Sequence, residues 1–309
     1  SVDFSAGGFQ AKFGDKLSSV LDITYRKPTE VQASLDASLL GVSVSAGDIS
    51  DDGKFTGIVG LRYRDNSLFV NAKETQTNFK PTFLDAQTYL SYKFNNKLEI
   101  GFLGNVAINK YSYKPLTRQT NFGTLADPVA VLVFYEGQEE DKYDTYFEDL
   151  KATYVASQNY TAKFIGSIYQ TQEQEYFDIL AQYRLGEVDT SIGSENLGDV
   201  TFSEGIGSQL THARNNLDAL IVNLEHKGNA TIGENEIEYG VKFTHEDIRD
   251  RVQEYEIIDS AGFSIRPPLV DFANLQPYEP FTSDIVPYTN IRAQNDVQIN
   301  RLSGYGQWS

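Results

Sequence analysis

At residues 98–109 the chain reads LEIGFLGNVAIN, and its even-numbered positions are all apolar or glycine. The odd-numbered positions include the polar residues Glu99 and Asn109. Successive side chains of an extended strand point to opposite faces, so this period of two predicts a strand with one apolar face. Residues 86–94 alternate in the same way, and the sequence NNK between the two runs is typical of a tight turn. The two runs together predict a β-hairpin.

The same alternation recurs along most of the chain, whereas helical periodicity is hard to find. Further alternating runs lie at residues 55–64, 146–154, 160–168, 220–224 and 237–244. No window approaches the roughly 18–20 uninterrupted apolar residues of a membrane helix. A membrane-spanning β-strand needs only about 9–11 residues, half of which can be polar. The pattern therefore predicts an all-β, antiparallel protein and permits a membrane barrel.

The expected connections between strands fall into two classes. The short ones lie at residues 64–67, 94–97, 157–160 and 227–235. The long ones lie at residues 113–144, 186–211 and 259–295, with shorter members near 47–53 and 75–84. Because the classes alternate, all long loops are expected at one end of the sheet, as in outer-membrane barrels. A soluble β-sandwich would explain the alternation of side chains without this asymmetry.

Composition limits the classes of function. The chain has 26 Lys plus Arg against 43 Asp plus Glu, a net charge of −17, which argues against a nucleic-acid partner. It has no cysteine, which excludes thiolate zinc sites and a cysteine nucleophile. The acidic turn at residues 48–53 has Val59, not Glu, at position twelve of a calcium loop. We expect no catalytic residue, metal or cofactor, and so no enzyme.

The first 27 residues do not fit a barrel strand. Residues 4–15 read FSAGGFQAKFGD, which is punctuated by glycine, and residues 20–24 read VLDIT, a compact strand. This segment resembles the end of the plug domain of TonB-dependent outer-membrane receptors. The residues that carry the resemblance are Gly7, Gly8, Phe13, Gly14 and Asp15. Residues 212–215 and 254–263 are similar to the larger receptors that carry a carboxypeptidase-regulatory-like extension before the plug.

The resemblance implies an architecture in which residues 1–27 end a plug domain. Residues 28–309 would then form the N-terminal part of a transmembrane antiparallel β-barrel, with about ten of roughly 22 strands. Ten strands are few for a barrel with such large loops, and the chain has no methionine. We therefore expect it to begin after a cleavage or to be part of a longer polypeptide.

The resemblance also implies a function: TonB-dependent active uptake of a nutrient across the outer membrane of a Gram-negative cell. The implied partners are an inner-membrane energy-coupling complex of the TonB type, outer-membrane lipid, and a small nutrient, glycan or peptide ligand. A surface lipoprotein lid is a further implied partner. The sequence does not predict the identity of the transported ligand, because no motif in the loops indicates one.

Two sets of residues are candidates for function. The first would line the lumen around the plug, or only hold the plug through polar contacts: Arg62, Arg64, Glu99, Asn105, Asn109, Lys163 and Lys242. The second would form an aromatic docking surface for a ligand, or pack the loops and anchor the membrane interface: Tyr111, Tyr113, Phe122, Phe134, Tyr135 and Tyr143.

Two other classes of protein compete with a transporter. One is a passive porin or adhesin-like barrel without a plug, and the other is a soluble carbohydrate-binding β-protein. The position of residues 4–26 separates the first from a transporter, because only a plug would lie inside the barrel. Extraction as a folded monomer without detergent would favour the second.

Overall fold

The computed structural model describes residues 2–7, 10–14, 18–72, 77–124, 127–261 and 285–308. Strands make up 80% of it and helices 3%, and the sheets are antiparallel, which confirms the expected fold class at this level. None of the helices in the described part of the chain has the length and apolarity needed to cross a membrane.

A small sheet and a large sheet contain all described strands. In the small sheet, β1 (Val2–Ser5) pairs with β2 (Val20–Ile23), and the short 3-10 helix η1 (Ala11–Phe13) lies between them in sequence. The strands of the large sheet are β3 (Gln32–Ser38), β4 (Gly41–Ile49), β5 (Phe55–Asp65), β6 (Thr77–Lys93), β7 (Leu98–Pro115), β8 (Arg118–Gly123), β9 (Pro128–Ser157), β10 (Tyr160–Val188), β11 (Val200–Ile232), β12 (Asn235–Asp259) and β13 (Ile285–Trp308). Helix α1 (Ser67–Ala72) connects β5 and β6.

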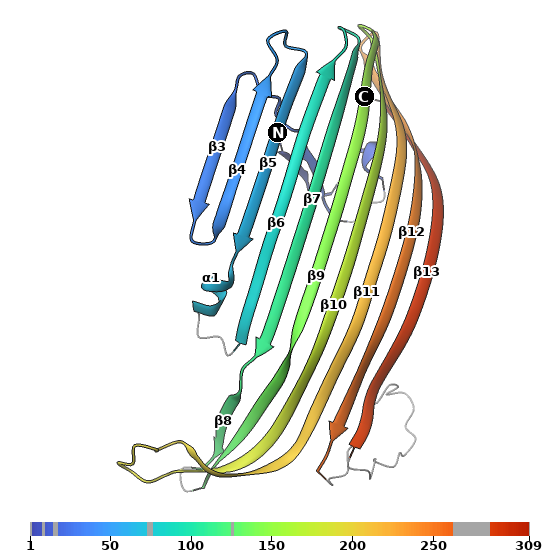
Figure 1. Ribbon diagram of the computed structural model, residues 1–309. Helices are drawn as coiled ribbons and strands as arrows, with labels where there is room; N and C mark the ends of the chain where they lie inside the picture. Colours follow the sequence, from blue (N-terminus) through green and yellow to red (C-terminus); the bar gives the residue numbers. More distant parts are fainter. Residues whose placement is uncertain are drawn as a thin grey trace.

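The large sheet follows the order of the chain. Ten strands lie side by side from β3 to β13, each antiparallel to the next, and β8 pairs with β9 beside this path (Figure 1). Within the described residues, β3 and β13 are the two edges of the sheet. The number of strands in this path agrees with the expected ten or so.

The predicted hairpin at residues 86–109 is present as β6 and β7. Lys93 lies opposite Glu99, and the register continues to Thr77 opposite Pro115. The side chain of Asn95 closes the turn, because its Oδ1 accepts hydrogen bonds from the backbone N–H groups of Lys97 (2.8 Å) and Leu98 (3.0 Å). An Asn side chain that mimics a backbone turn in this way explains why NNK ends both strands.

Most of the segments expected to be long loops are strands. Residues 113–144 contain β8 and the first half of β9, and residues 186–211 contain the end of β10 and the start of β11. Of residues 259–295, those from 285 belong to β13, and 262–284 lie outside the described residues. The prediction was wrong because these stretches lack apolar alternation, whereas their backbones are paired in register with neighbouring strands.

Two shorter connections lie at the opposite end from the one expected. Residues 47–49 end β4, and residues 50–53 begin its connection to β5, at the same end as the tight turns 94–97, 158–159 and 233–234. The connection that includes residues 64–67 and α1 lies at the other end, and residues 77–84, expected to be a loop, are part of β6. We call these ends the short-turn end and the distal end.

The longest strands extend far beyond the thickness of a membrane. β9, β10 and β11 contain 30, 29 and 33 residues. At about 3.3 Å per residue each is on the order of 100 Å long, whereas about 9–11 residues cross a bilayer. The long strands bend as they run toward the distal end (Figure 1).

The N-terminal segment defines the two faces of the large sheet. The ring of Tyr25 stacks on Tyr89 of β6 with centroids 5.4 Å apart, and Lys27 forms an ion pair with Glu99 of β7. Figure 1 shows this segment behind the sheet. We call the face that it contacts the inner face and the opposite one the outer face.

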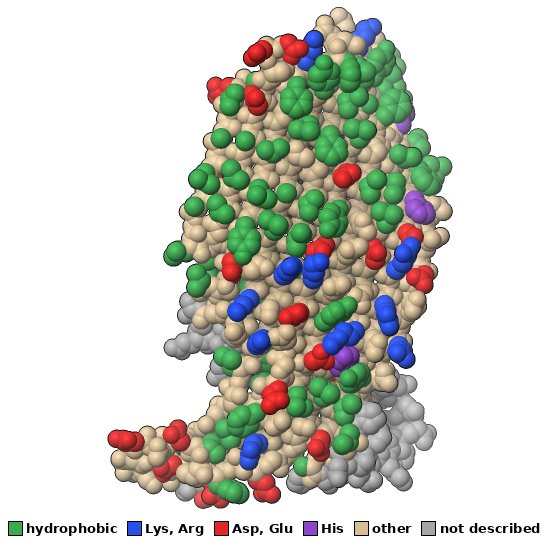
Figure 2. All heavy atoms as spheres, viewed as in Figure 1, with side chains coloured by type: hydrophobic (Ala, Val, Ile, Leu, Met, Phe, Trp, Pro, Cys, Tyr) green, Lys and Arg blue, Asp and Glu red, His purple; other side chains and the backbone are tan. Residues whose placement is uncertain are grey.

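The outer face is apolar near the short-turn end. Figure 2 shows hydrophobic side chains gathered over this part of the face turned toward the viewer, with Lys and Arg side chains across its middle. Phe164, Leu224 and Trp308 are 54%, 59% and 75% exposed. The fully buried side chains are mostly small, such as Ala130 and Ala213, so the described sheet has no large hydrophobic core on either face. We call this part of the outer face the apolar band.

Candidate functional site

All seven lumen candidates lie on the inner face. Gln87, which accepts a hydrogen bond from Tyr25, lies directly opposite Asn105, and alternation then places Glu99 and Asn109 on the same face. The same reasoning places Arg62 and Arg64 of β5, Lys163 of β10 and Lys242 of β12 there. Their distribution over four strands agrees with a polar inner surface.

The inner-face candidates differ in what they contact. Glu99 pairs with Lys27 and so holds the N-terminal segment to β7. Arg62 pairs instead with Asp85 of the neighbouring strand β6, with Nη2 2.8 Å from Oδ2. Of these residues, Glu99 therefore contacts the N-terminal segment, whereas Arg62 contacts a neighbouring strand of the sheet.

Three of the five residues that carry the resemblance to a plug end, Gly7, Phe13 and Gly14, lie in the described part of the N-terminal segment. Phe13 ends η1, its backbone N–H donates to the carbonyl of Gln10 at 3.0 Å, and Gly14 follows as the cap. Gly7 has a φ of +111°, a conformation that favours glycine. Gly8 and Asp15 lie outside the described residues. The strand expected at residues 20–24 is present as β2.

Three of the six aromatic candidates come together, and three do not. Tyr111 and Tyr113 of β7 and Tyr143 of β9 line one hollow of about 370 Å³ on the inner face. The others lie elsewhere: Phe122 is exposed on β8, Phe134 is exposed on β9, and Tyr135 of β9 lies near Tyr183 of β10. The six aromatic residues therefore do not form one continuous surface, because they belong to different faces and levels of the strands.

Register places the remaining lining residues of this hollow, which we call the aromatic–acidic hollow. Tyr113 lies opposite Phe79 of β6 on one side and Glu139 of β9 on the other, and Tyr111 lies opposite Asp141 of β9. The lining residues are Phe79, Tyr111, Tyr113, Glu139, Asp141 and Tyr143. Sequence reasoning missed the acidic residues, because residues 113–144 were expected to form a loop.

The aromatic rings hold one another in fixed orientations. Tyr111 stacks on Phe79 with centroids 6.0 Å apart, and it meets Phe83 and Tyr143 edge to face at 5.6 and 5.7 Å. Such offset and edge-to-face pairs contribute roughly 0.5–1.5 kcal/mol each beyond the area that they bury. Tyr111 is therefore the central ring of the cluster.

The carboxylates of the hollow repel one another. Burial raises the pKa of Asp141 to about 6, and repulsion from Glu139 and from Glu175 of β10 adds to the shift. Burial, followed by repulsion from Glu175, also raises the pKa of Glu139. Glu175 accepts a hydrogen bond of 2.8 Å from the hydroxyl of Tyr143. Oδ1 of Asp141 is buried without a hydrogen-bond partner among the described residues.

We expect Asp141→Asn to raise the unfolding temperature above pH 6 and to leave it unchanged at pH values below the ordinary pKa of 3.8. Between these values the folded protein holds a proton that the unfolded chain has released, so stability falls as the pH rises. Asn has no charge to bury and removes this loss. The charged or titratable groups facing Asp141 are Tyr111, Tyr113, Glu139, Tyr143, Glu173 and Glu175.

Thermal unfolding in detergent micelles across this pH range measures the effect. Glu140→Gln is the control, because Glu140 is exposed and alternation places it on the outer face. An unfolding temperature of Asp141→Asn at or below that of the parent above pH 6 would contradict the burial of a charged Asp141.

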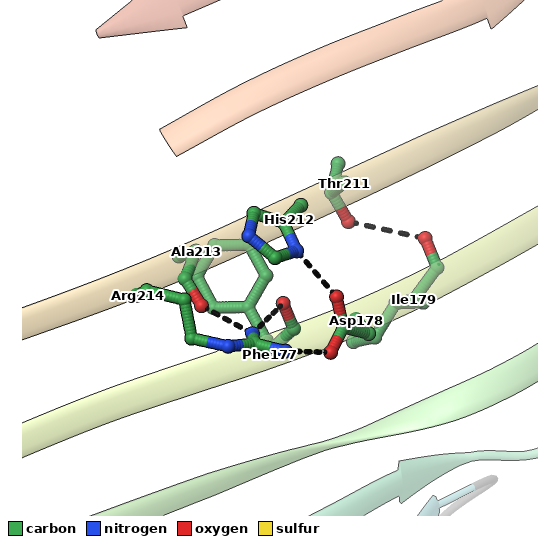
Figure 3. A network of polar contacts seen from close by, with 7 residues as sticks. All are labelled: Phe177, Asp178, Ile179, Thr211, His212, Ala213 and Arg214. Atoms are coloured by element: carbon green, nitrogen blue, oxygen red, sulfur yellow. Dashed lines mark hydrogen bonds and ion pairs between the residues drawn. The ribbon is translucent and has the colours of Figure 1, made fainter. Parts of the chain in front are cut away.

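A second polar cluster lies on the outer face, distal to the apolar band. Asp178 of β10 accepts hydrogen bonds from His212 (2.5 Å) and Arg214 of β11 (Figure 3). His212 also stacks on Tyr255 of β12 at 4.4 Å, and the Arg214 guanidinium lies 5.3 Å from the ring centroid of Tyr176. Burial raises the pKa of Asp178, but the two hydrogen bonds outweigh burial and hold the pKa below its ordinary value.

This outer cluster joins three neighbouring strands. Its histidine and carboxylate form a pair that could in principle move a proton, but no described hydroxyl is hydrogen-bonded to His212. The nearby hydroxyl of Thr211 donates instead to the carbonyl of Ile179, at 3.3 Å (Figure 3). The cluster therefore stabilises the sheet and offers no nucleophile.

The described residues contain no group of three or more His, Cys, Asp or Glu side chains that could hold a metal ion. A scan against protein-family models and searches of curated proteins and of solved structures found no match to this chain.

Proposed function

We propose that this chain is part of a TonB-dependent outer-membrane transporter that takes up a nutrient ligand into a Gram-negative cell. In this proposal residues 1–27 end the plug, and β3 to β13 are about ten of the roughly 22 strands of a transmembrane barrel. The resemblance of the plug-end residues suggests the family, and the arrangement of the two faces supports it.

The observation that carries the proposal is the contrast between the faces of the large sheet. The outer face exposes large apolar side chains such as Phe164 and Leu224 near the short-turn end, where lipid would cover them. The inner face is polar there, and the N-terminal segment lies against it through Tyr25 and Lys27. A plug inside a barrel requires this combination, whereas a porin or adhesin without a plug does not.

Two further features agree with a barrel. Among the described strands, β3 and β13 each have a neighbour on one side only, and a bilayer does not tolerate an open sheet edge, so additional strands would close the sheet. Tyr154, Tyr160, Tyr239 and Trp308 lie at the short-turn end of the sheet, where Tyr and Trp anchor proteins at the lipid–water interface. The distal halves of the long strands would then project outside the cell.

The proposed partners are those that the resemblance implies. An inner-membrane energy-coupling complex of the TonB type would displace the plug, and lipid would surround the apolar band. A small nutrient, glycan or peptide would bind on the distal part of the inner face, and a surface lipoprotein could cover that opening. The aromatic–acidic hollow is the candidate ligand site, because it lies on the inner face beyond the apolar band.

Membrane fractionation of cells that express the full natural polypeptide tests the proposal. We expect the protein in the outer-membrane fraction, released by detergent and not by high salt or alkali, because lipid covers the apolar band. Release as a folded monomer without detergent would support the soluble carbohydrate-binding alternative. Outer-membrane localisation with uptake that needs no energy source would support a passive barrel.

A further inference from the structure

Within the part of the chain that the structure describes, the carboxylates of the aromatic–acidic hollow have no counter-charge. Among the described residues, Glu139, Asp141 and Glu175 form no ion pair, whereas Asp85, Asp144 and Glu246 of the same sheet each pair with a Lys or Arg. Lys142 follows Asp141 in sequence, but it pairs with Asp144 at 2.6 Å on the outer face. The hollow therefore keeps an excess of negative charge.

The rings of the hollow also favour a positive charge. Aromatic faces attract an ammonium or guanidinium group within about 6 Å of the ring centroid. Phe79, Tyr111, Tyr113 and Tyr143 line the hollow beside the carboxylates, and its volume of about 370 Å³ is in the range of small-ligand sites. Rings and carboxylates together surround a space that suits an organic cation.

We propose that the aromatic–acidic hollow binds the cationic group of a ligand, an ammonium or guanidinium such as that of a basic peptide. A neutral sugar could also stack on Tyr111, but it would bury Glu139 and Asp141 further without neutralising them, which is costly. A cation neutralises the two carboxylates and so removes that cost, and it also interacts favourably with the faces of the aromatic rings. The proposal rests on the proposed function for the claim that the ligand is transported.

Two tripeptides of matched shape test the charge preference directly. Gly-Arg-Gly carries a guanidinium, and Gly-citrulline-Gly replaces it with a neutral group of nearly the same size. We expect Gly-Arg-Gly to bind the full polypeptide in detergent micelles at least about ten-fold more tightly than Gly-citrulline-Gly does, because charge-assisted hydrogen bonds are stronger than neutral ones. Isothermal titration calorimetry or equilibrium dialysis measures both affinities. Equal binding of the two peptides, or tighter binding of maltotriose, would overturn the proposal.

Variants of the hollow connect the binding to this site. Tyr111→Ala removes the central ring and should weaken Gly-Arg-Gly binding about five-fold. Asp141→Asn should weaken it about ten-fold, and this variant is expected to remain folded because it removes a buried charge. Glu140→Gln is the matched control, since it removes one negative charge from the outer face of the same strand. Equal effects of Asp141→Asn and Glu140→Gln would show that net charge alone attracts the peptide, and the site would be rejected.

The outcome separates this inference from the proposed function. Fractionation and energy-dependent uptake test the transporter without reference to the hollow. If those succeed while Gly-Arg-Gly fails to bind, only the ligand class is wrong. If Gly-Arg-Gly binds but the protein is released without detergent, the hollow stands and the transporter does not.

Discussion

Cross-linking position 25 to position 89 is expected to reduce uptake to the level of cells that lack the gene. The rings of Tyr25 and Tyr89 lie 5.4 Å apart, one on the N-terminal segment and one on β6. Cysteines at both positions can therefore be joined by a short cross-linker that attaches through disulfides, and this chain contains no cysteine that would compete. Because the proposed transport requires the plug to move relative to the barrel, a covalent link between them stops it.

The full natural polypeptide is expressed in cells, and a nutrient is chosen on which these cells grow only when the polypeptide is present. The measurement is the uptake of that nutrient. Reductant cleaves the cross-link and should restore uptake, which excludes a folding defect. Tyr63→Cys with Leu84→Cys is the matched control, because this pair joins β5 to β6 on the outer face of the sheet and should leave uptake unchanged. Normal uptake in the cross-linked Tyr25–Tyr89 variant would mean that the segment stays in place, and the plug mechanism would fail.

A charge in the apolar band is expected to prevent stable insertion. Leu224 is 59% exposed on β11 and lines a shallow apolar hollow with Leu150, Phe164 and Val241. Arg or Lys on the lipid face near the bilayer midplane costs about 2–4 kcal/mol. Leu224→Arg should therefore lower the free energy of unfolding in lipid vesicles by an amount of that order, and less protein should reach the outer membrane.

Gln174→Arg is the matched control for this substitution. Gln174 is exposed on the outer face of β10 but lies distal to the apolar band, so an added charge there should change the free energy of unfolding little. Denaturant titration of both variants in vesicles gives the comparison. If Leu224→Arg is as stable as Gln174→Arg, water and not lipid covers the apolar band.

The sequence predicted strands best where one face is apolar. The hairpins at residues 86–109 and 146–168 were found because apolar side chains alternate with polar ones in both strands. The acidic sequence from Glu136 to Asp141 predicts a loop, but these residues form part of β9 as well. In the proposed barrel, both faces beyond the apolar band would meet water, so the side chains there would need no alternation and backbone pairing would maintain the strand.

The candidate site was predictable only in part for the same reason. Tyr111, Tyr113 and Tyr143 were identified as a possible ligand surface, but Phe79 and Asp141 were not. Glu139, Asp141 and Tyr143 occupy alternate positions, so they share a face once the segment is known to be extended. If the alternation of side chains is continued through residues 136–144, it places the two acidic residues on the same face as Tyr143.

Sequence by itself determined the all-β class and the assignment of the lumen candidates to one face, because both follow from the local period of two. Only the tertiary structure decided where the strands end and at which end of the sheet residues 47–53 lie. It also decided that Phe79, Tyr111, Asp141 and Glu175, from four strands, meet at one place. Which side chains come together depends on the register between strands. Backbone hydrogen bonds fix this register between residues that are far apart in sequence, so no local sequence pattern predicts it.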